Sequence, residues 1–140
     1  MTRTTEWAYV ALGSNLGDRP GNLAAARKAL GALPMTTLAA ASRIEETAPL
    51  AGMDQPPYLN QMVLLKTALD PHTLLAACQA IELSAGRARG ERWAPRTLDL
   101  DIVRFGDRHL DQPDLIIPHP ELSHRDFWLR ELAELQPNEL

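Results

Sequence analysis

The sequence predicts an α+β domain built on an antiparallel sheet with helices packed on one face. Apolar segments of strand-like composition and two segments of helical spacing follow one another in the order β-α-β-β-α-β. Each helical segment begins with an aspartate closely followed by a proline, residue types that favour helix starts. At 140 residues and 15.5 kDa, the chain is expected to form one domain over residues 1–140.

The first strand and helix are defined by their boundaries. Residues 7–12 are predicted to form a largely buried strand that ends at the glycine-containing segment 13–17. Asp18 is the predicted N-cap of the first helix, Pro20 lies in its first turn, and Pro34 is expected to stop it. Its apolar residues recur at helical spacing, at Leu23, Ala26, Leu30 and Leu33.

The middle of the chain is predicted to hold two strands. Residues 36–47 are rich in alanine, which favours a helix, but their threonines and Ile44 permit a strand, and a strand is the prediction. Residues 48–57 contain three prolines and a glycine and are expected to be irregular. Residues 58–67 are predicted to form the next strand.

The second helix and the strand after it complete the core. Asp70 and Pro71 are expected to begin a helix that runs to about Ala85, with Gly86 at its end. A loop over residues 87–97 then leads to a strand at 98–102. The order of these six elements is that of a ferredoxin-like fold.

Three smaller features follow the predicted core. Gly106 and Asp107 are expected to make a hairpin turn, and residues 116–120 a rigid connector. Residues 127–135 are predicted to form a short amphipathic helix. The predicted architecture is therefore a ferredoxin-like core with a short C-terminal hairpin and helix.

Composition and charge restrict the function classes. A net charge of −4 argues against a general nucleic-acid-binding protein, which needs a basic surface. The one cysteine, Cys78, excludes an internal disulfide, fits a reducing cytoplasm and is expected in the core. The sequence has no apolar segment of the ~20 residues needed to span a membrane, and residues 1–6 lack the apolar core of a secretory signal. A cytoplasmic protein without a membrane partner is expected.

Two aspartates on one predicted strand are the strongest functional signal. Asp99 and Asp101 alternate with Leu98, Leu100 and Ile102, so both carboxylates project from the face opposite to the apolar side chains. Their Cα atoms are expected roughly 6.5–7 Å apart at a rise of ~3.3 Å per residue. A divalent cation would cancel their repulsion, although a solvated outer face of a sheet gives the same alternation.

An arginine-rich loop precedes this strand. Arg87, Arg89, Arg92 and Arg96 fall within ten positions of a chain that has only two lysines. The planar guanidinium group suits bidentate contacts with phosphate, so the loop and the two aspartates together indicate a polyphosphate ligand. Arg96 adjoins the strand and is expected to be fixed, whereas the other three are expected to close over the ligand as a lid. Trp93, in the same loop, is either a plug against the domain or a flap over the substrate.

Other polar and aromatic residues are weaker candidates. Glu82 borders the apolar stripe of the second helix and can be a ligand contact or a structural carboxylate. Tyr58, Asn60 and Phe127 offer ring stacking and an amide to a flat heteroaromatic ligand. His119 can contact phosphate or serve the structure. The histidines show no zinc-binding spacing with the cysteine.

These motifs together resemble the 6-hydroxymethyl-7,8-dihydropterin pyrophosphokinase family over nearly the whole chain. The long signature of that family is matched from Arg92 to Ile102. Shorter matches are the segments 11–17 and 54–60, Pro118-His119-Pro120 and Arg125-Asp126-Phe127. The resemblance implies a ferredoxin-like fold and transfer of the β,γ-diphosphate of ATP to the hydroxymethyl group of the pterin, with release of AMP.

The resemblance also implies roles for individual residues. Asp99 and Asp101 would bind two Mg²⁺ ions, and the catalytic residues would be Arg87, Arg92, Arg96, Asp99 and Asp101. ATP would contact Gln79, Glu82, Arg89, Trp93, Arg96, Ile102, His119 and Arg125. The pterin would contact Thr47, Ala48, Leu50, Tyr58, Asn60, Trp93, Asp99 and Phe127.

Two other functions are compatible with parts of the sequence. One is a ferredoxin-like RNA-binding module that uses the arginine loop, which the acidic strand and the net charge oppose. The other is a different metal-dependent nucleotide transferase with an Asp-x-Asp site. The leading expectation is an ATP- and Mg²⁺-dependent diphosphotransferase of folate biosynthesis that acts as a monomer on small molecules, with no nucleic-acid partner.

Overall fold

Four antiparallel strands and two helices form the core of the computed structural model, which describes residues 4–48, 57–85 and 97–135. The core elements are β1 (Glu6–Ser14), α1 (Arg19–Gly31), β2 (Thr36–Ala41), β4 (Tyr58–Thr67), α2 (Pro71–Ser84) and β5 (Asp99–Phe105). The additions are β3 (Glu45–Thr47), β6 (Leu110–Gln112), β7 (Leu115–Ile117), a short 3-10 turn (Leu122–His124) and α3 (Asp126–Leu135).

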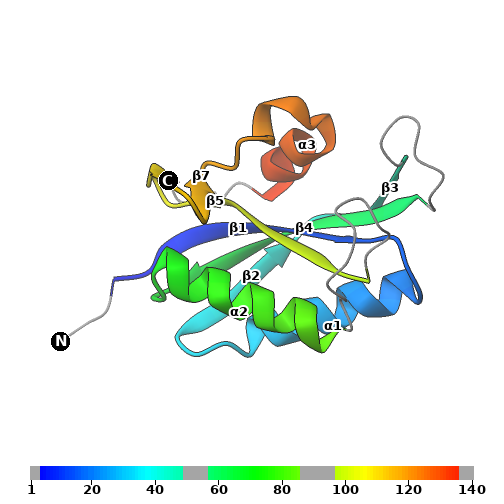
Figure 1. Cartoon of the computed structure of the whole chain (residues 1–140), viewed down its shortest axis with the longest axis horizontal. Coiled ribbons are helices and arrows are strands. Elements are labelled where there is room, and N and C mark those ends of the chain that lie inside the picture. Colours follow the sequence, from blue (N-terminus) through cyan, green and yellow to red (C-terminus); the bar gives the residue numbers. More distant parts are fainter. Residues whose placement is uncertain (1–3, 49–56, 86–96, 136–140) are drawn as a thin grey trace.

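The sheet has the strand order β2-β4-β1-β5, with β3 paired to β4 beyond the end of β2. Every adjacent pair in it is antiparallel. This order and the helices between the strands confirm the predicted ferredoxin-like core. In Figure 1, α1 and α2 lie on one side of the sheet and α3 lies on the other.

Aspartate side chains begin both core helices, as predicted. Asp18 Oδ1 accepts a hydrogen bond from the Gly21 amide at 3.1 Å, and Asp70 Oδ1 accepts one from the Thr73 amide at 2.9 Å. Both bonds satisfy amides that have no partner within the helix. Helix α1 ends at Gly31, three residues before the expected stop at Pro34.

The pleat of the strands divides the interior into two apolar clusters. The larger one lies between the sheet and the helices α1 and α2, and includes Val10, Leu65 and Leu100. The smaller one lies on the opposite face and includes Met62 and Val103 together with Trp128 of α3. The sequence predicted the helices on one face, but not that the C-terminal helix covers part of the other.

The predicted strand over residues 36–47 is two strands, and Ser42 is the reason. Its amide donates to the Met62 carbonyl at 2.8 Å, and its hydroxyl accepts from the Met62 amide at 2.9 Å. The Gln61 side chain donates to the Ser42 carbonyl at 2.6 Å. These bonds replace regular ladder pairing at that point, so β2 ends at Ala41 and pairing resumes in β3.

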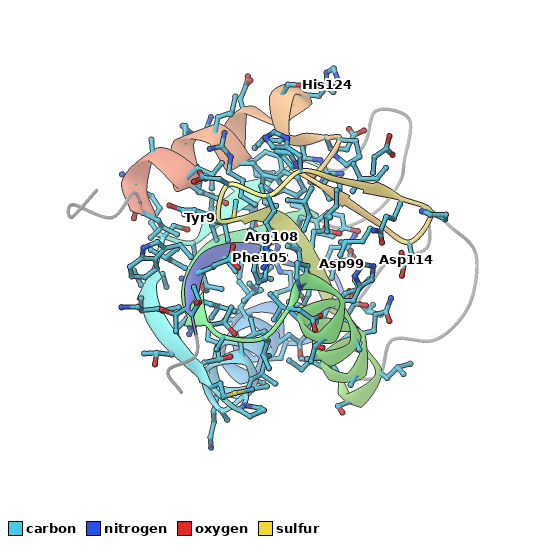
Figure 2. All side chains as sticks on the ribbon, turned by 90° about the vertical axis from the view of Figure 1, so that its left-hand side faces the viewer. Tyr9, Asp99, Phe105, Arg108, Asp114 and His124 are labelled. Atoms are coloured by element: carbon cyan, nitrogen blue, oxygen red, sulfur yellow. The ribbon has the colours of Figure 1, made fainter. Side chains whose placement is uncertain are left out.

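Two predictions after β5 were wrong in detail. Gly106 and Asp107 do form a turn, but the chain does not return along β5 there, and the hairpin is the pair β6–β7. Its own turn lies at Pro113 and Asp114, and Figure 2 shows Asp114 at the tip. The expected connector over residues 116–120 is shorter, because Ile116 and Ile117 belong to β7. The three consecutive apolar residues 115–117 were compatible with either a strand or an irregular connector.

No helix in residues 4–48, 57–85 and 97–135 is long and apolar enough to cross a membrane.

The thiol of Cys78 should be inert in the folded protein. Its side chain is 1% exposed, and burial, together with the nearby carboxylates of Glu82 and Asp101, raises its pKa to about 12. We therefore expect an aromatic disulfide reagent at about pH 8 to label the thiol only after urea has unfolded the chain. Rapid labelling of the native protein at one thiol per chain would contradict the buried position.

Candidate active site

The strand pairing aligns four residues in one row across the face of the sheet that carries α3. Glu45 of β3 pairs with Asn60 of β4, Asn60 pairs with Gly13 of β1, and Gly13 pairs with Asp99 of β5. Directly paired residues point to the same face of a sheet. This row lies on the same face as the smaller apolar cluster, and Arg130 of α3 contacts its outer member, Glu45.

Asp99 and Asp101 lie on the face predicted for them. Leu98, Leu100 and Ile102 are at most 5% exposed and pack in the larger cluster, so the two aspartates project to the opposite face. The Asp101 side chain is 41% exposed. Among the described residues, no group of three or more His, Cys, Asp or Glu side chains that could hold a metal ion comes together.

His119 stands beside Asp101. Its Nε2 is 3.8 Å from Asp101 Oδ1, which is too long for a hydrogen bond. Its Nδ1 accepts from the Glu121 amide at 3.0 Å, so the neutral ring carries its proton on Nε2, which faces the aspartate. Burial lowers the pKa of His119, although Asp101 opposes that effect, so the ring is neutral at pH 7.

Gly13, which is buried and has no side chain, forms a floor between Asn60 and Asp99. A Cβ atom at this position would lie 3.4 Å from both the Tyr58 ring and Asn60 Oδ1. The Asn60 amide group is held by a donated hydrogen bond to Thr47 Oγ1 at 2.5 Å. The structure therefore brings the predicted pterin contacts Thr47, Tyr58 and Asn60 together, and it leaves Ala48 exposed just after β3.

Helix α3 brings two further predicted residues toward this face. Phe127 is half-buried in its first turn and packs against the smaller cluster. The Arg125 guanidinium carbon lies 4.4 Å from the ring centre of Trp128, a cation–π contact. His119 meets the same indole edge-on, with ring centres 5.0 Å apart. The sequence analysis missed Trp128, whose indole contacts both Arg125 and His119, two predicted ATP contacts.

Glu82 has a structural contact in addition to its predicted ligand role. It is 6% exposed, and its Oε2 accepts a hydrogen bond from the Leu100 amide at 2.7 Å. Leu100 lies between the two aspartates on β5, the edge strand of the sheet. The carboxylate thus fixes the outer edge of the strand to α2. Gln79 lies one turn earlier on α2 and is exposed.

A pocket of about 230 Å³ lies along the same edge of β5. Two predicted nucleotide contacts, Ile102 and His119, line it, and so does Asp101. The sequence analysis did not predict this pocket, because short strands such as β7 give no clear periodic signal. Its other apolar walls include Leu75, Leu100, Leu115 and Ile116. His72 Nε2 of α2 lies 3.4 Å from Oδ1 of Asp114, which is in the turn of the β6–β7 hairpin and also lines the pocket.

Asn22 of α1 is another residue that the sequence analysis missed. Its side-chain amide donates to Ser14 Oγ at 3.2 Å, to the Leu16 carbonyl at 3.0 Å and to the Thr97 carbonyl at 3.2 Å. It therefore ties the glycine-containing turn after β1 to the residues that enter β5. The remaining predicted contacts lie outside the described residues; these are Leu50, Arg87, Arg89, Arg92, Trp93 and Arg96.

Comparison with known proteins places this site in a family. The model of the 7,8-dihydro-6-hydroxymethylpterin-pyrophosphokinase family matches residues 9–137. The chain belongs to this family. The family match confirms the resemblance that the sequence motifs indicated.

Several curated relatives are similar over most of their length. A 2-amino-4-hydroxy-6-hydroxymethyldihydropteridine pyrophosphokinase of Pseudomonas aeruginosa is 48% identical over 130 residues, covering 93% of this chain and 80% of the relative. The Bacillus subtilis protein of the same name is 44% identical, covering 91% and 77%. That of Methylorubrum extorquens is 39% identical, covering 99% and 85%.

The contact between Glu82 and β5 should contribute measurably to stability. Glu82→Ala leaves the buried Leu100 amide without its charged acceptor, so we expect the free energy of unfolding in urea to fall by about 1.5–3 kcal/mol. Gln79→Ala, an exposed change on the same helix, should alter it by less than about 0.5 kcal/mol. Equal effects of the two substitutions would show that the bond does not hold the strand.

Proposed function

We propose that this chain transfers the β,γ-diphosphate of ATP to the hydroxymethyl oxygen of 6-hydroxymethyl-7,8-dihydropterin. The products are the pterin diphosphate and AMP, in a step of folate biosynthesis. Family membership and the names of the curated relatives support the proposal. The cytoplasmic location and the monomeric state expected from the sequence stay predictions.

One observation carries the proposal. Asp99 stands next to the floor at Gly13, and Asp101 lines the pocket at the edge of β5. A flat acceptor on the floor and a nucleotide in the pocket would therefore meet at the two carboxylates. This is the arrangement that a direct transfer between two bound substrates requires, because the reacting atoms must be brought into line.

The floor suits a pterin. We assign Tyr58, which lies beside Gly13, and Phe127, in the first turn of α3, to stack on the two faces of the heterocycle. Asn60 has a fixed amide that can read the polar edge of the heterocycle. Thr47, Ala48, Leu50 and Trp93 complete the proposed pterin site, the last two from outside the described residues.

The pocket suits the nucleotide. Its apolar walls fit the faces of a purine ring, and we place the phosphates beside Asp101 and His119, two of the three polar residues that line it together with Asp114. The neutral His119 ring directs an Nε2–H toward Asp101 and can donate to a phosphate oxygen. Gln79, Glu82 and Arg125 are the other proposed ATP contacts that the structure describes, and Arg89, Trp93 and Arg96 lie outside it.

The two aspartates fit magnesium. Both supply hard oxygen ligands from one face, and Mg²⁺ commonly takes one or two carboxylates and fills its other positions with water and phosphate oxygens. When bound there, two ions would neutralise charge on the transferred diphosphate and align the attacking and leaving oxygens. We assign Asp99 and Asp101 to hold them, and Arg87, Arg92 and Arg96 to bind the same phosphates.

Within the reaction, the chain mainly positions its substrates. The pterin hydroxyl oxygen attacks the β-phosphorus and gives up its proton to solvent. The new phosphorus–oxygen bond forms as the bond from the β-phosphorus to the oxygen that bridges it to the α-phosphorus breaks, and AMP leaves with that oxygen. Tyr58 and Phe127 orient the acceptor, while the pocket at β5 orients the donor. An RNA-binding role is not favoured, because the corresponding sheet face carries Asp99 and Asp101.

The activity itself is tested by AMP release. With ATP, Mg²⁺ and the hydroxymethyldihydropterin, we expect AMP to form in equal amount with the pterin diphosphate. Asp99→Ala and Asp101→Ala should each lower kcat by about a thousandfold or more with the fold intact. Asp107→Ala, in the exposed turn after β5, is the matched control and should leave kcat unchanged. Near-normal turnover by either aspartate variant would refute the metal assignment.

The two substrate sites should respond separately to substitution. Tyr58→Ala removes a stacking ring, so we expect KM for the pterin to rise about tenfold and KM for ATP to stay constant. Ile116→Ala opens a wall of the pocket at an exposed position and should raise KM for ATP alone. Each variant is the control for the other. If both substitutions raised KM for the same substrate, the proposed division into two substrate sites would be wrong.

A further inference from the structure

Two glutamates that the proposed reaction does not use meet between β3 and α3. Glu131 of α3 is 1% exposed, and the Glu45 side chain of β3 is 19% exposed. Glu45 Oε2 and both oxygens of Glu131 are buried and accept no hydrogen bond from a donor in the part of the chain that the structure describes. The two carboxyl groups nevertheless lie close enough for each to shift the pKa of the other through a hydrogen bond. Two carboxyl groups can share such a bond only if one of them is protonated.

The surroundings assign the proton to Glu131. Its neighbours on the buried face of α3 are Trp128 and Leu135, which disfavour a charge. Glu45 instead has a cation beside it, with Arg130 Nη2 at 3.0 Å from its Oε1. Burial, above all, and then the contact with Glu45 raise the pKa of Glu131 to about 9. The hydrogen bond from Glu131 is the main cause that lowers the pKa of Glu45.

Each glutamate of this pair lies on an element that carries a proposed pterin contact: Glu45 on β3 with Thr47, and Glu131 on α3 with Phe127. Glu45 is the outer member of the row that continues through Asn60 and Gly13 to Asp99. Glu131 lies four residues after Phe127 and therefore on the same side of α3. A change in how α3 sits on β3 would therefore move Phe127 relative to Thr47 and to the Asn60 amide that Thr47 holds.

We propose that Glu131 is a positioning residue for the pterin site: its protonated carboxyl donates a hydrogen bond to Glu45, seats α3 against β3 and so fixes Phe127 relative to Thr47 and Asn60. The proposal rests on the proposed function for its ligand. It adds a proton-dependent contact that is remote from the two aspartates. Loss of the proton places two negative charges in contact at a buried position, which disfavours this seating.

The charged groups around the pair are few. Arg130 and Glu134 come from α3, and Arg43 comes from the segment before β3, where its amide donates to Glu134 Oε2 at 2.9 Å. Strand β4 presents the apolar Met62 and Leu64 to this side of the sheet. Among these groups, Glu131 is the one whose pKa is raised into the alkaline range.

The direction of the pH effect follows from this pKa. The folded chain holds the Glu131 proton up to about pH 9, whereas the unfolded chain releases it near the ordinary value of 4.5. The contribution of the protonated pair to stability is therefore complete below 4.5, declines above it and is lost as the pH rises through about 9. The seating of α3 should loosen over the upper part of this range.

The proton can be tested without substrate. In protein labelled with ¹³C at glutamate carboxyls, the signal absent from Glu131→Gln identifies Glu131, and we expect its titration midpoint near 9. Glu45→Gln removes the neighbouring negative charge and should lower the midpoint by about one pH unit or more. Glu134→Gln is the matched control on the same helix and should move it much less. A Glu131 midpoint below about 6 would overturn the proton assignment.

The positioning role is tested by the pterin KM against pH. Between about pH 7 and about pH 10, we expect this KM to rise roughly tenfold more for the natural chain than for Glu131→Gln, whose amide keeps a donor without a titrating proton. The comparison cancels titration of the pterin itself. KM for ATP should show no such difference. If KM for the pterin changed with pH in the same way in the two proteins, the positioning role would be overturned. If no AMP formed at any pH, the proposed function would be refuted, and the carboxyl titration alone would then test the proton assignment.

Discussion

The alternation of side chains along β5 is the constraint on which the site depends. Leu98, Leu100 and Ile102 are buried against the core helices, so Asp99 and Asp101 must face the other way. A slip of one residue in pairing with β1 would bury both carboxylates and expose the leucines. Glu82 opposes that slip from the outer edge of the strand by holding the Leu100 amide, and Gly13 and Ala11 fix the register from the inner edge.

The same alternation explains why one sheet face serves two purposes. On the face opposite to α1 and α2, one end of the sheet carries apolar residues that pack with α3, and the other end carries the row from Glu45 to Asp99. After Asp101, β5 has one residue more than β1 at the point where the pairing shifts. The extra residue is Val103, which packs in the smaller cluster with Trp128, and Phe105 then lies in the larger cluster. The irregularity thus lets one strand serve the site, the second cluster and the core in turn.

The sequence predicted the elements with clear local signals and missed those that depend on tertiary contacts. Capping aspartates and periodic leucines were enough to define α1 and α2, and alternation was enough to place Asp99 and Asp101 on one face. The break at Ser42 could not be predicted, because it arises from hydrogen bonds to a residue twenty positions away. Trp128, the walls of the pocket and the Glu45–Glu131 contact likewise join segments that are distant in the sequence, and no periodic pattern reports them.

The central claim is that donor and acceptor meet over Asp99 and Asp101, with the pterin on the floor at Gly13. The most direct measurement is a crystal structure with Mg²⁺, 6-hydroxymethylpterin and an ATP analogue whose α,β-bridging oxygen is replaced by a methylene group that resists transfer. The account predicts the pterin between Tyr58 and Phe127, the purine in the pocket at the edge of β5, and both ions on the two aspartates. A pterin bound on another face of the sheet, or a metal that avoids both carboxylates, would contradict it.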